Sequence, residues 1–238
     1  MPPAIRRLDL AMYARAVPLL FTHLSILAVP LLAAVVDLLV ERITPLFTDA
    51  LGGGGAGLFG MLVQLVYLWA FGVAIVQASN IWRSRRGSFD EAWEESRTKF
   101  GSIALAAIGF QFVVWVASYV GSFLGALGGS VGLVLGAVAA FFLIYTIPAA
   151  AIGGLPGQMA LAASIRGVRA NVVASVILAI VFFGLWYVLV PMVLPYLLVH
   201  LSPLLWQLVA AAVRAIVLAY LAFPFAKQYD DVAFTRFW

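Results

Sequence analysis

The sequence predicts an all-α, polytopic membrane protein with six transmembrane helices in three hairpins. Of its 238 residues, 65% are hydrophobic and 10% are charged, whereas a soluble domain is nearer half apolar and a quarter charged. So few polar residues cannot cover a water-facing surface, and membrane lipids must therefore cover most of it. In addition, twelve of the fourteen Lys and Arg residues lie in four short segments that separate long apolar runs. These segments are residues 6–15, 83–99, 166–169 and 227–236.

Six apolar runs are long enough to cross a bilayer, because a span needs about 20 residues for a hydrocarbon core of about 30 Å. They cover approximately residues 16–40, 58–81, 103–123, 131–152, 172–194 and 204–225. No remaining stretch is long and polar enough for a soluble domain. We therefore expect residues 1–238 to form a single integral membrane domain, with the first span retained rather than removed as a signal peptide.

The basic residues predict which way the chain faces. Six spans place both termini on one side, together with the loops after the second and fourth spans, and these parts hold the four basic segments. The opposite loops, residues 43–57, 124–130 and 195–203, contain no Lys or Arg. Since basic loops stay cytoplasmic, we expect both termini in the cytoplasm and the protein in a bacterial inner membrane. The same distribution explains the net charge of +4 without a nucleic-acid partner.

The outer loops are expected to differ in kind. Four consecutive glycines at residues 52–55 predict a flexible turn in the first loop, and the second is also rich in glycine. Pro191 and Pro195 are expected to break the fifth span, leaving an apolar stretch that lies in the interface or packs on the bundle. Ser202 and Pro203 then fit the cap and first turn of the last helix.

An internal repeat is visible in residues 87–99 and 157–169, which carry Gly, an apolar residue, Ala and a base at the same offsets before a span. The repeated unit would be a short cytoplasmic helix, an outward span, a turn and a return span. Three units fit, with residues 8–15 as the first short helix, although chance similarity in so biased a composition is an alternative. Residues 89–100 place apolar and acidic side chains on opposite faces, which predicts an interfacial amphipathic helix or a docking surface for a basic partner.

Residues 147–180 (IPAAAIGGLPGQMALAASIRGVRANVVASVILAI) carry a family resemblance, as does Tyr229-Asp230 after the last span. The matching positions are Pro148, Gly157, Ala162, Ser164, Arg166, Arg169 and Asn171. The chain resembles the six-helix membrane domain found before glycerophosphodiester phosphodiesterases, and the uncharacterised YciC-like bacterial proteins. It departs from them at Gly153-Gly154, where an acidic residue is usual. The resemblance implies a six-span bundle without known catalytic residues, since the phosphodiesterase activity belongs to a separate soluble domain.

Arg214 is the base that topology does not explain, because it lies near the middle of the sixth span. A central Arg costs about 2.5–3.5 kcal/mol on insertion scales, so it must face protein or water. Asp37 in the first span is the expected partner, at roughly 7 Å below the outer surface against roughly 16 Å for Arg214. Gln64 and Gln111 are other polar candidates. The group is either a structural ion pair, within the chain or with a neighbouring subunit, or a site for an anionic ligand or headgroup.

Small residues predict close packing of the third and fourth spans. Glycine recurs every fourth residue in two rows, and the positions predicted to pack are Gly121, Gly125, Gly128, Gly132 and Gly136. The alternative is that these rows form a homodimer face.

Catalytic patterns are missing from the sequence. There are no cysteines, and the two histidines, His23 and His200, are expected at opposite ends of the bundle. The sequence contains no intramembrane zincin, nucleophile-elbow, P-loop or paired-carboxylate motif. We therefore expect no enzyme activity, no metal and no cofactor.

Three functions follow from these observations. The first is an accessory or scaffold subunit of a membrane complex, with other membrane proteins as partners. The second is a carrier of a lipid or small molecule with an intramembrane site at Arg214. The third, with least support, is a lipid-modifying enzyme.

Overall fold

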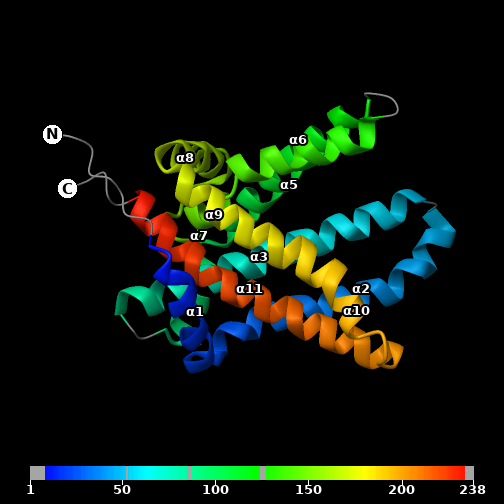
Figure 1. Ribbon diagram of the computed structural model, residues 1–238, viewed down its shortest axis with the longest axis horizontal. Helices are drawn as coiled ribbons and strands as arrows, with labels where there is room; N and C mark the ends of the chain where they lie inside the picture. The colour runs from blue at the N-terminus through cyan, green and yellow to red at the C-terminus, as the bar shows by residue number, and fades with distance from the viewer. Residues whose placement is uncertain (1–8, 52, 85–86, 124–126, 234–238) are drawn as a thin grey trace.

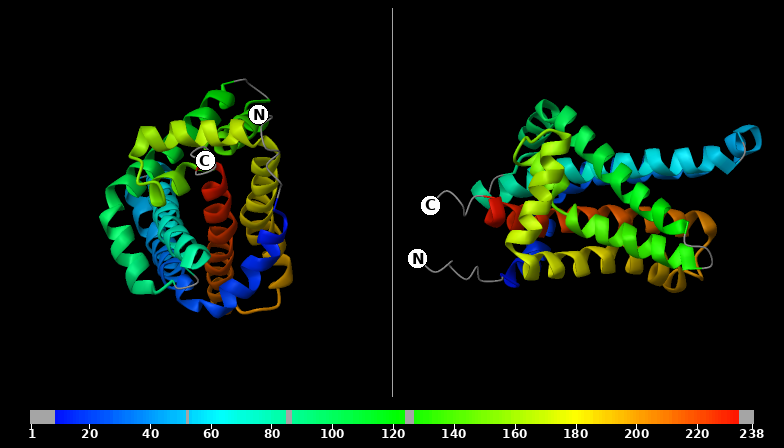
Figure 2. Two further views of the ribbon diagram at one scale, coloured as in Figure 1. Left: turned by 90° about the vertical axis from the view of Figure 1, so that its left-hand side faces the viewer. Right: turned by 90° about the horizontal axis from the view of Figure 1, so that it is seen from above.

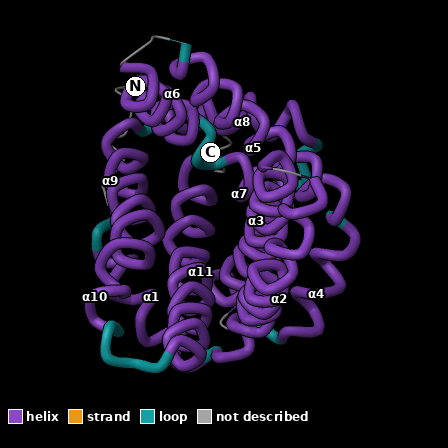
Figure 3. Tube along the Cα trace, turned by 90° about the vertical axis from the view of Figure 1, so that its right-hand side faces the viewer, coloured by secondary structure: helices purple, strands orange, loops and turns teal. Residues whose placement is uncertain are grey.

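The computed structural model describes residues 9–51, 53–84, 87–123 and 127–233, and within these ranges the chain forms helices and short connections without any strand. Six of its helical segments are long and apolar enough to cross a membrane, which confirms the all-α, six-span prediction. They cover Leu24–Leu46, Phe59–Ser84, Phe100–Ser122, Gly128–Ala151, Val172–Leu197 and Pro203–Ala233. In Figure 3 the loops and turns are short beside the helices, and two of the connections between spans contain a helix of their own, α4 or α8.

Several short helices accompany the long ones along the chain. In sequence order, the elements are α1 (Ala11–Thr22), the 3₁₀-helix η1 (Leu24–Leu27), α2 (Ala28–Leu51), α3 (Gly53–Ser84), α4 (Phe89–Thr98), α5 (Phe100–Ser122), α6 (Gly128–Phe142), α7 (Thr146–Ala151), α8 (Gly157–Ala170), α9 (Val172–Phe183), the π-helix η3 (Gly184–Val193), α10 (Leu194–Leu197) and α11 (Pro203–Ala233).

Helix α11 is the central element of the bundle. It packs against α1, α2, α3 and η3, and every residue from Leu221 to Ala226 is buried. The start of α1 and the end of α11 lie at one end of the bundle, which we call the terminal end (Figure 1). At the other end, the distal end, α2 and α3 extend beyond α6 and α10 (Figures 1 and 2).

The first span begins later than the sequence predicts. Residues 16–22 belong to α1, which ends where His23 leaves the helical region at φ −126° and ψ 59°. Helix α2 then carries Pro30 in its first turn, where a missing N–H costs no hydrogen bond. The predicted span of residues 16–40 is therefore replaced by Leu24–Leu46. A hydropathy profile does not reveal this break in the helix, because the residues on both sides of it are apolar.

The first outer loop is much shorter than predicted. Helix α2 continues to Leu51 and α3 begins at Gly53, so residues 43–57 are mostly helical, and Gly52 lies outside the described residues. Glycine costs a helix roughly 1 kcal/mol relative to alanine. The helical hydrogen bonds of the paired α2 and α3 outweigh this cost, because a backbone near lipid needs internal partners.

The fifth span is not broken at Pro191. The helical path widens from α9 into the ten-residue π-helix η3, which contains Pro191 and leads into α10. In a π-helix each N–H bonds five residues back, so the turn is wider than in an α-helix and accommodates the ring. The span accordingly runs from Val172 to Leu197. Helix α11 begins at Pro203, as predicted.

The helix of the fourth span contains a break that the sequence did not predict. Helices α6 and α7 are separated by a turn at residues 143–145. Ser164 of α8 bridges this turn: its hydroxyl donates to the carbonyl of Phe142 at 2.9 Å and accepts from the N–H of Tyr145 at 2.9 Å. The freed backbone groups are therefore satisfied inside the protein.

The side chain of Tyr145 joins α9 and α11 near the terminal end. Gln228 of α11 donates to the Tyr145 hydroxyl at 2.8 Å, which lies 2.9 Å from Ser175 Oγ of α9. Because Ser175 donates its own proton to the carbonyl of Asn171 at 2.8 Å, Tyr145 is the donor to Ser175. Both hydroxyl protons of this network are thus assigned, whereas the buried Oε1 of Gln228 accepts no hydrogen bond from the described residues.

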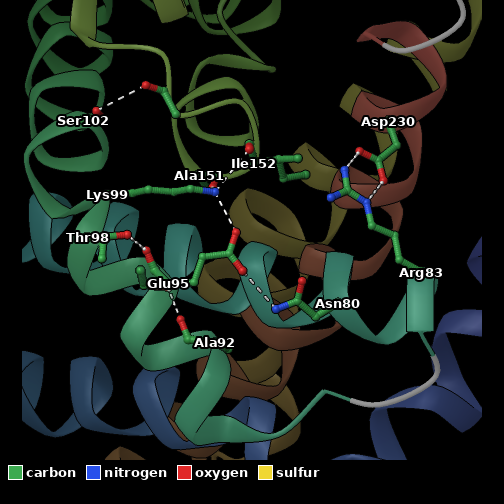
Figure 4. A network of polar contacts seen from close by, with 12 residues as sticks. Asn80, Arg83, Ala92, Glu95, Thr98, Lys99, Ser102, Ala151, Ile152 and Asp230 are labelled. Atoms are coloured by element: carbon green, nitrogen blue, oxygen red, sulfur yellow. Dashed lines mark hydrogen bonds and ion pairs between the residues drawn. The ribbon is translucent and has the colours of Figure 1, made fainter.

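A second polar network holds α4 and α5 to the bundle at the terminal end (Figure 4). The ammonium of Lys99 donates to Glu95 at 2.7 Å and to the carbonyls of Ala151 and Ile152 at 2.9 and 3.2 Å. These carbonyls end α7, where the helix dipole favours a cation. Asn80 of α3 donates to the other oxygen of Glu95 at 3.1 Å.

The end of α11 is tied to the end of α3 in the same region. Arg83 donates two hydrogen bonds to Asp230, from Nη2 at 2.8 Å and from Nε at 3.2 Å (Figure 4). This bidentate geometry is the strongest form of a guanidinium–carboxylate contact.

Helices α5 and α6 make the close contact that the glycine rows predict. A Cβ atom built on Gly121 would lie 2.4 Å from the Cα of Gly132, and one on Gly136 would lie 2.2 Å from Ser118 Oγ. Gly128 packs equally closely on the backbone of Ser122. Gly125 lies outside the described residues. The other member of its row, Gly129, has no atom within 4 Å of its Cβ position.

Candidate functional site

Arg214 and Asp37 form an ion pair between α11 and α2. Arg214 Nη1 donates to Asp37 Oδ2, and the hydroxyl of Tyr67 of α3 donates to the same oxygen at 2.8 Å. Arg214 Nη1 also lies 3.8 Å from Glu41 Oε1, one helical turn along α2 from Asp37. The predicted pairing is therefore present, and three helices contribute to it.

The pair meets at one depth because the first span is displaced from its predicted position. Asp37 lies nine residues before the end of the span at Leu46, which is about 14 Å along a helix. Arg214 lies eleven residues after Pro203, which is about 16 Å. The predicted span would place Asp37 and Arg214 at depths that differ by roughly 9 Å, and the observed span removes most of this difference.

The charges in this cluster differ in exposure. The side chain of Asp37 is 10% exposed, that of Arg214 is 26% exposed and that of Glu41 is 45% exposed. A buried carboxylate is tolerated when a base and a second donor satisfy it, as Arg214 and Tyr67 do here. Glu41 has no hydrogen bond within the described chain, so its carboxylate is the least compensated member of the cluster.

The ion pair lines a pocket of about 420 Å³ between α2, α3, η3 and α11. Its walls are formed by Asp37, Val40, Glu41, Thr44, Gly60, Val63, Gln64, Tyr67, Trp186, Tyr187, Val190, Pro191 and Arg214. Several of the lining residues, among them Glu41, Gln64 and Tyr187, are exposed. The pocket is therefore accessible from outside the bundle, and its volume suits a small molecule or a lipid headgroup.

One wall of the pocket is aromatic. Tyr67 and Trp186 meet edge to face, with ring centroids 5.3 Å apart. Trp186, Tyr187 and Pro191 all come from the π-helix η3, and π-helical segments are frequent at functional sites. The feature that the sequence suggested as a break in the fifth span thus forms part of the site.

Only one of the two predicted glutamines lines the same pocket as the ion pair. Gln64 lines the 420 Å³ pocket. Gln111 does not: it lines a smaller neighbouring cavity of about 50 Å³, together with Gln64, Tyr67 and Trp186. Among the predicted polar residues, the structure therefore places Asp37, Arg214 and Gln64 together and sets Gln111 apart.

Glu41, Tyr67, Trp186 and Tyr187 were not predicted as site residues. Helical spacing could have indicated the first two, since Glu41 is four residues after Asp37 and Tyr67 is three residues after Gln64. No pattern in the sequence indicated the two residues from η3, because tryptophan and tyrosine near the end of a span are ordinary interfacial residues.

The described part of the chain contains no group of three or more His, Asp or Glu side chains placed to hold a metal ion. His23 ends α1, and His200 lies in the connection before α11. These two histidines are therefore far apart along the bundle.

Comparison of the chain with protein-family models, with curated proteins and with solved structures found no match. The resemblance to the membrane domain of glycerophosphodiester phosphodiesterases and to YciC-like proteins therefore stays a prediction. Two of the positions that carry it, Ser164 and Asn171, take part in the hydrogen bonds described above.

Proposed function

We propose that this protein is a non-enzymatic membrane protein that binds a small polar molecule or a lipid headgroup in the Arg214 pocket, as a carrier of that ligand does. The observation that carries the proposal is a 420 Å³ pocket lined by an ion pair at membrane depth. Charged residues inside a membrane are costly and typically mark a ligand or ion pathway.

An ion pair with a purely structural role would not require an adjacent pocket. Apolar residues of similar volume usually stabilise a buried site as well as an ion pair does. The exposed Glu41 and Gln64 and the aromatic wall add polar and stacking groups beyond those that Asp37 requires. The pocket thus combines an apolar enclosure with a few convergent polar groups, as ligand sites do.

An accessory or scaffold role is the second candidate, and α5 and α6 favour it. Their outer faces expose large apolar side chains over their whole length, including Phe112, Tyr119 and Leu133. Lipid covers such a surface, and so does a neighbouring membrane subunit. A stable protein partner that survives purification would favour this role over ligand carriage.

Orientation in a bacterial inner membrane is part of the proposal. The basic residues Arg83, Lys99, Arg166, Arg169 and Lys227 belong to the elements at the terminal end. We infer that this end faces the cytoplasm, because basic residues favour the cytoplasmic side. The Arg214 pocket then lies in the half of the membrane away from the cytoplasm.

The test is native mass spectrometry of the purified protein released from lipid nanodiscs. We expect Arg214→Leu to change the amount of small molecule or lipid that wild type retains, because it alters the charge of the pocket. Arg83→Leu is the matched control, because it removes an ion-paired arginine at the opposite end of the bundle and should retain the wild-type amount. If wild type and Arg214→Leu carry the same species in the same amount, or if wild type carries none, the binding proposal is wrong.

A further inference from the structure

We propose that the ligand of the Arg214 pocket presents a positively charged nitrogen, a primary or quaternary ammonium group, to Glu41 and the aromatic wall. This inference rests on the proposed binding function and concerns the chemistry of its ligand. The sequence alone suggested an anion for Arg214, and the arrangement of charges reverses that expectation.

The charges of the pocket favour a cation. Arg214 supplies one positive charge, and its Nη1 is directed at Asp37 and Glu41. With both carboxylates ionised, the cluster has one excess negative charge. An anion that approached Arg214 would meet these two carboxylates as well, and like charges at such distances repel strongly in a poorly screened site.

Oxygen atoms of both carboxylates also remain available to accept hydrogen bonds from a ligand. Arg214 and Tyr67 both bond to Asp37 Oδ2, and Oδ1 accepts no hydrogen bond from the described residues. The only polar contact of Glu41 within the described chain is its 3.8 Å approach to Arg214. Arg42, the neighbouring base on α2, is exposed and is not among the lining residues.

The aromatic wall suits the same ligand. Tyr67, Trp186 and Tyr187 line the pocket beside the two carboxylates. Aromatic faces attract cations through the quadrupole of the ring, and sites for quaternary ammonium groups are built from several such rings. An anion gains nothing from the faces of these rings.

The ammonium group could come from a soluble amine or from the headgroup of a zwitterionic lipid. For the soluble source, tetramethylammonium chloride is titrated into the purified protein in uncharged detergent at constant ionic strength, with sodium phosphate as the anionic probe. Isothermal titration calorimetry should detect binding of tetramethylammonium and no binding of phosphate. Glu41→Gln and Trp186→Leu should each weaken tetramethylammonium binding about tenfold, whereas Glu94→Gln, which removes an exposed carboxylate from α4, should not.

For the lipid source, nanodiscs of equal phosphatidylcholine and phosphatidylglycerol content are used, and the lipid that the protein retains is identified by native mass spectrometry. Retained phosphatidylcholine that Glu41→Gln loses would identify the headgroup as the ligand. Tetramethylammonium binding without retained lipid would identify a soluble amine.

The outcomes separate this inference from the proposed function. Retained phosphatidylglycerol, or binding of phosphate, that is lost in Arg214→Leu would overturn the ammonium inference and leave the binding function standing. No binding of either probe together with no retained lipid would overturn both. Equal binding by wild type and Glu41→Gln would also overturn the ammonium inference.

Discussion

Asp37 accepts two hydrogen bonds on one oxygen, from Arg214 and from Tyr67. It is also one of the most deeply buried acids of the described chain, with 7% of its surface exposed. Removal of its base would leave a carboxylate inside the membrane with only a neutral donor. Removal of both charges would leave an apolar site whose tyrosine hydroxyl faces the pocket. The two changes therefore differ sharply in their expected effects.

Arg214→Leu should lower the free energy of unfolding by about 3–5 kcal/mol, because it leaves Asp37 buried without a base. The double variant Asp37→Leu/Arg214→Leu should be within about 1 kcal/mol of wild type. Thermal unfolding in detergent, followed by tryptophan fluorescence, measures both. A single variant as stable as wild type would show that the two charges do not depend on each other.

Glu95 predicts a pH dependence at the terminal end. Burial alone would raise the pKa of Glu95, but hydrogen bonds from Lys99 and Asn80 outweigh it and hold the pKa below its ordinary value of 4.5. Folding therefore favours the ionised form. The stabilisation is present above the unfolded pKa and is lost as the pH falls through the lower, folded pKa.

The unfolding temperature of wild type should fall as the pH is lowered from about 7 to about 3, in part because Glu95 is protonated. Glu95→Gln should show a smaller fall, whereas Glu91→Gln, which changes an exposed acid on the same helix, should follow wild type. Equal pH profiles for wild type and Glu95→Gln would contradict the role assigned to Lys99 and Asn80.

At the scale of elements, the contact of α5 with α6 depends on the absence of side chains at Gly121 and Gly132. Their backbones approach so closely that even one Cβ atom would overlap the opposite helix. Lipid chains are as apolar as leucine, so this approach gains its stability from close packing and not from the exclusion of water.

Gly132→Val should force α5 and α6 apart and destabilise the protein by about 1–3 kcal/mol, as overpacking does. Gly129→Val is the matched control, because nothing lies within 4 Å of its Cβ position. Spin labels on the exposed residues Val113 and Val138 can report the separation of the two helices. If Gly132→Val changes neither stability nor distance, the described contact is wrong.

Helix η3 shows what hydropathy can and cannot predict. The apolar run and Pro191 are visible in the sequence, but whether a proline breaks a span or lies in a wider helical turn depends on what packs around it. The same holds for His23, where the chain leaves the helix within an apolar run. Asp37 and Arg214 could be paired from the sequence because charges inside a membrane need partners. Tyr67 and Trp186 could not, since their types are common and only the fold brings them to the pocket.

At the scale of the whole molecule, the two ends of the bundle have different chemistry. The terminal end carries most of the basic residues and the polar networks around Lys99 and Arg83. The described part of the distal end is mostly apolar apart from the Arg214 pocket and the neighbouring Arg42. This difference should set the orientation in the membrane.

Orientation can be measured with single cysteines, because the chain has none of its own. Tyr196→Cys, which replaces an 82% exposed residue at the distal end, should react with a membrane-impermeant maleimide in intact cells. Arg166→Cys, at the terminal end, should react only after the membrane is permeabilised. The reverse pattern would contradict cytoplasmic termini.

The most direct test of the pocket as a binding site is native mass spectrometry of Asp37→Leu/Glu41→Gln/Arg214→Leu beside wild type. This triple variant removes every charge of the cluster. It should fold with near wild-type stability, because Asp37 and Arg214 are removed together and the Glu41 side chain is exposed, so loss of a ligand cannot be attributed to unfolding. We predict that wild type retains a bound small molecule or lipid and that the folded triple variant does not. Retention of the same species by the folded triple variant would contradict the assignment of the Arg214 pocket as the site.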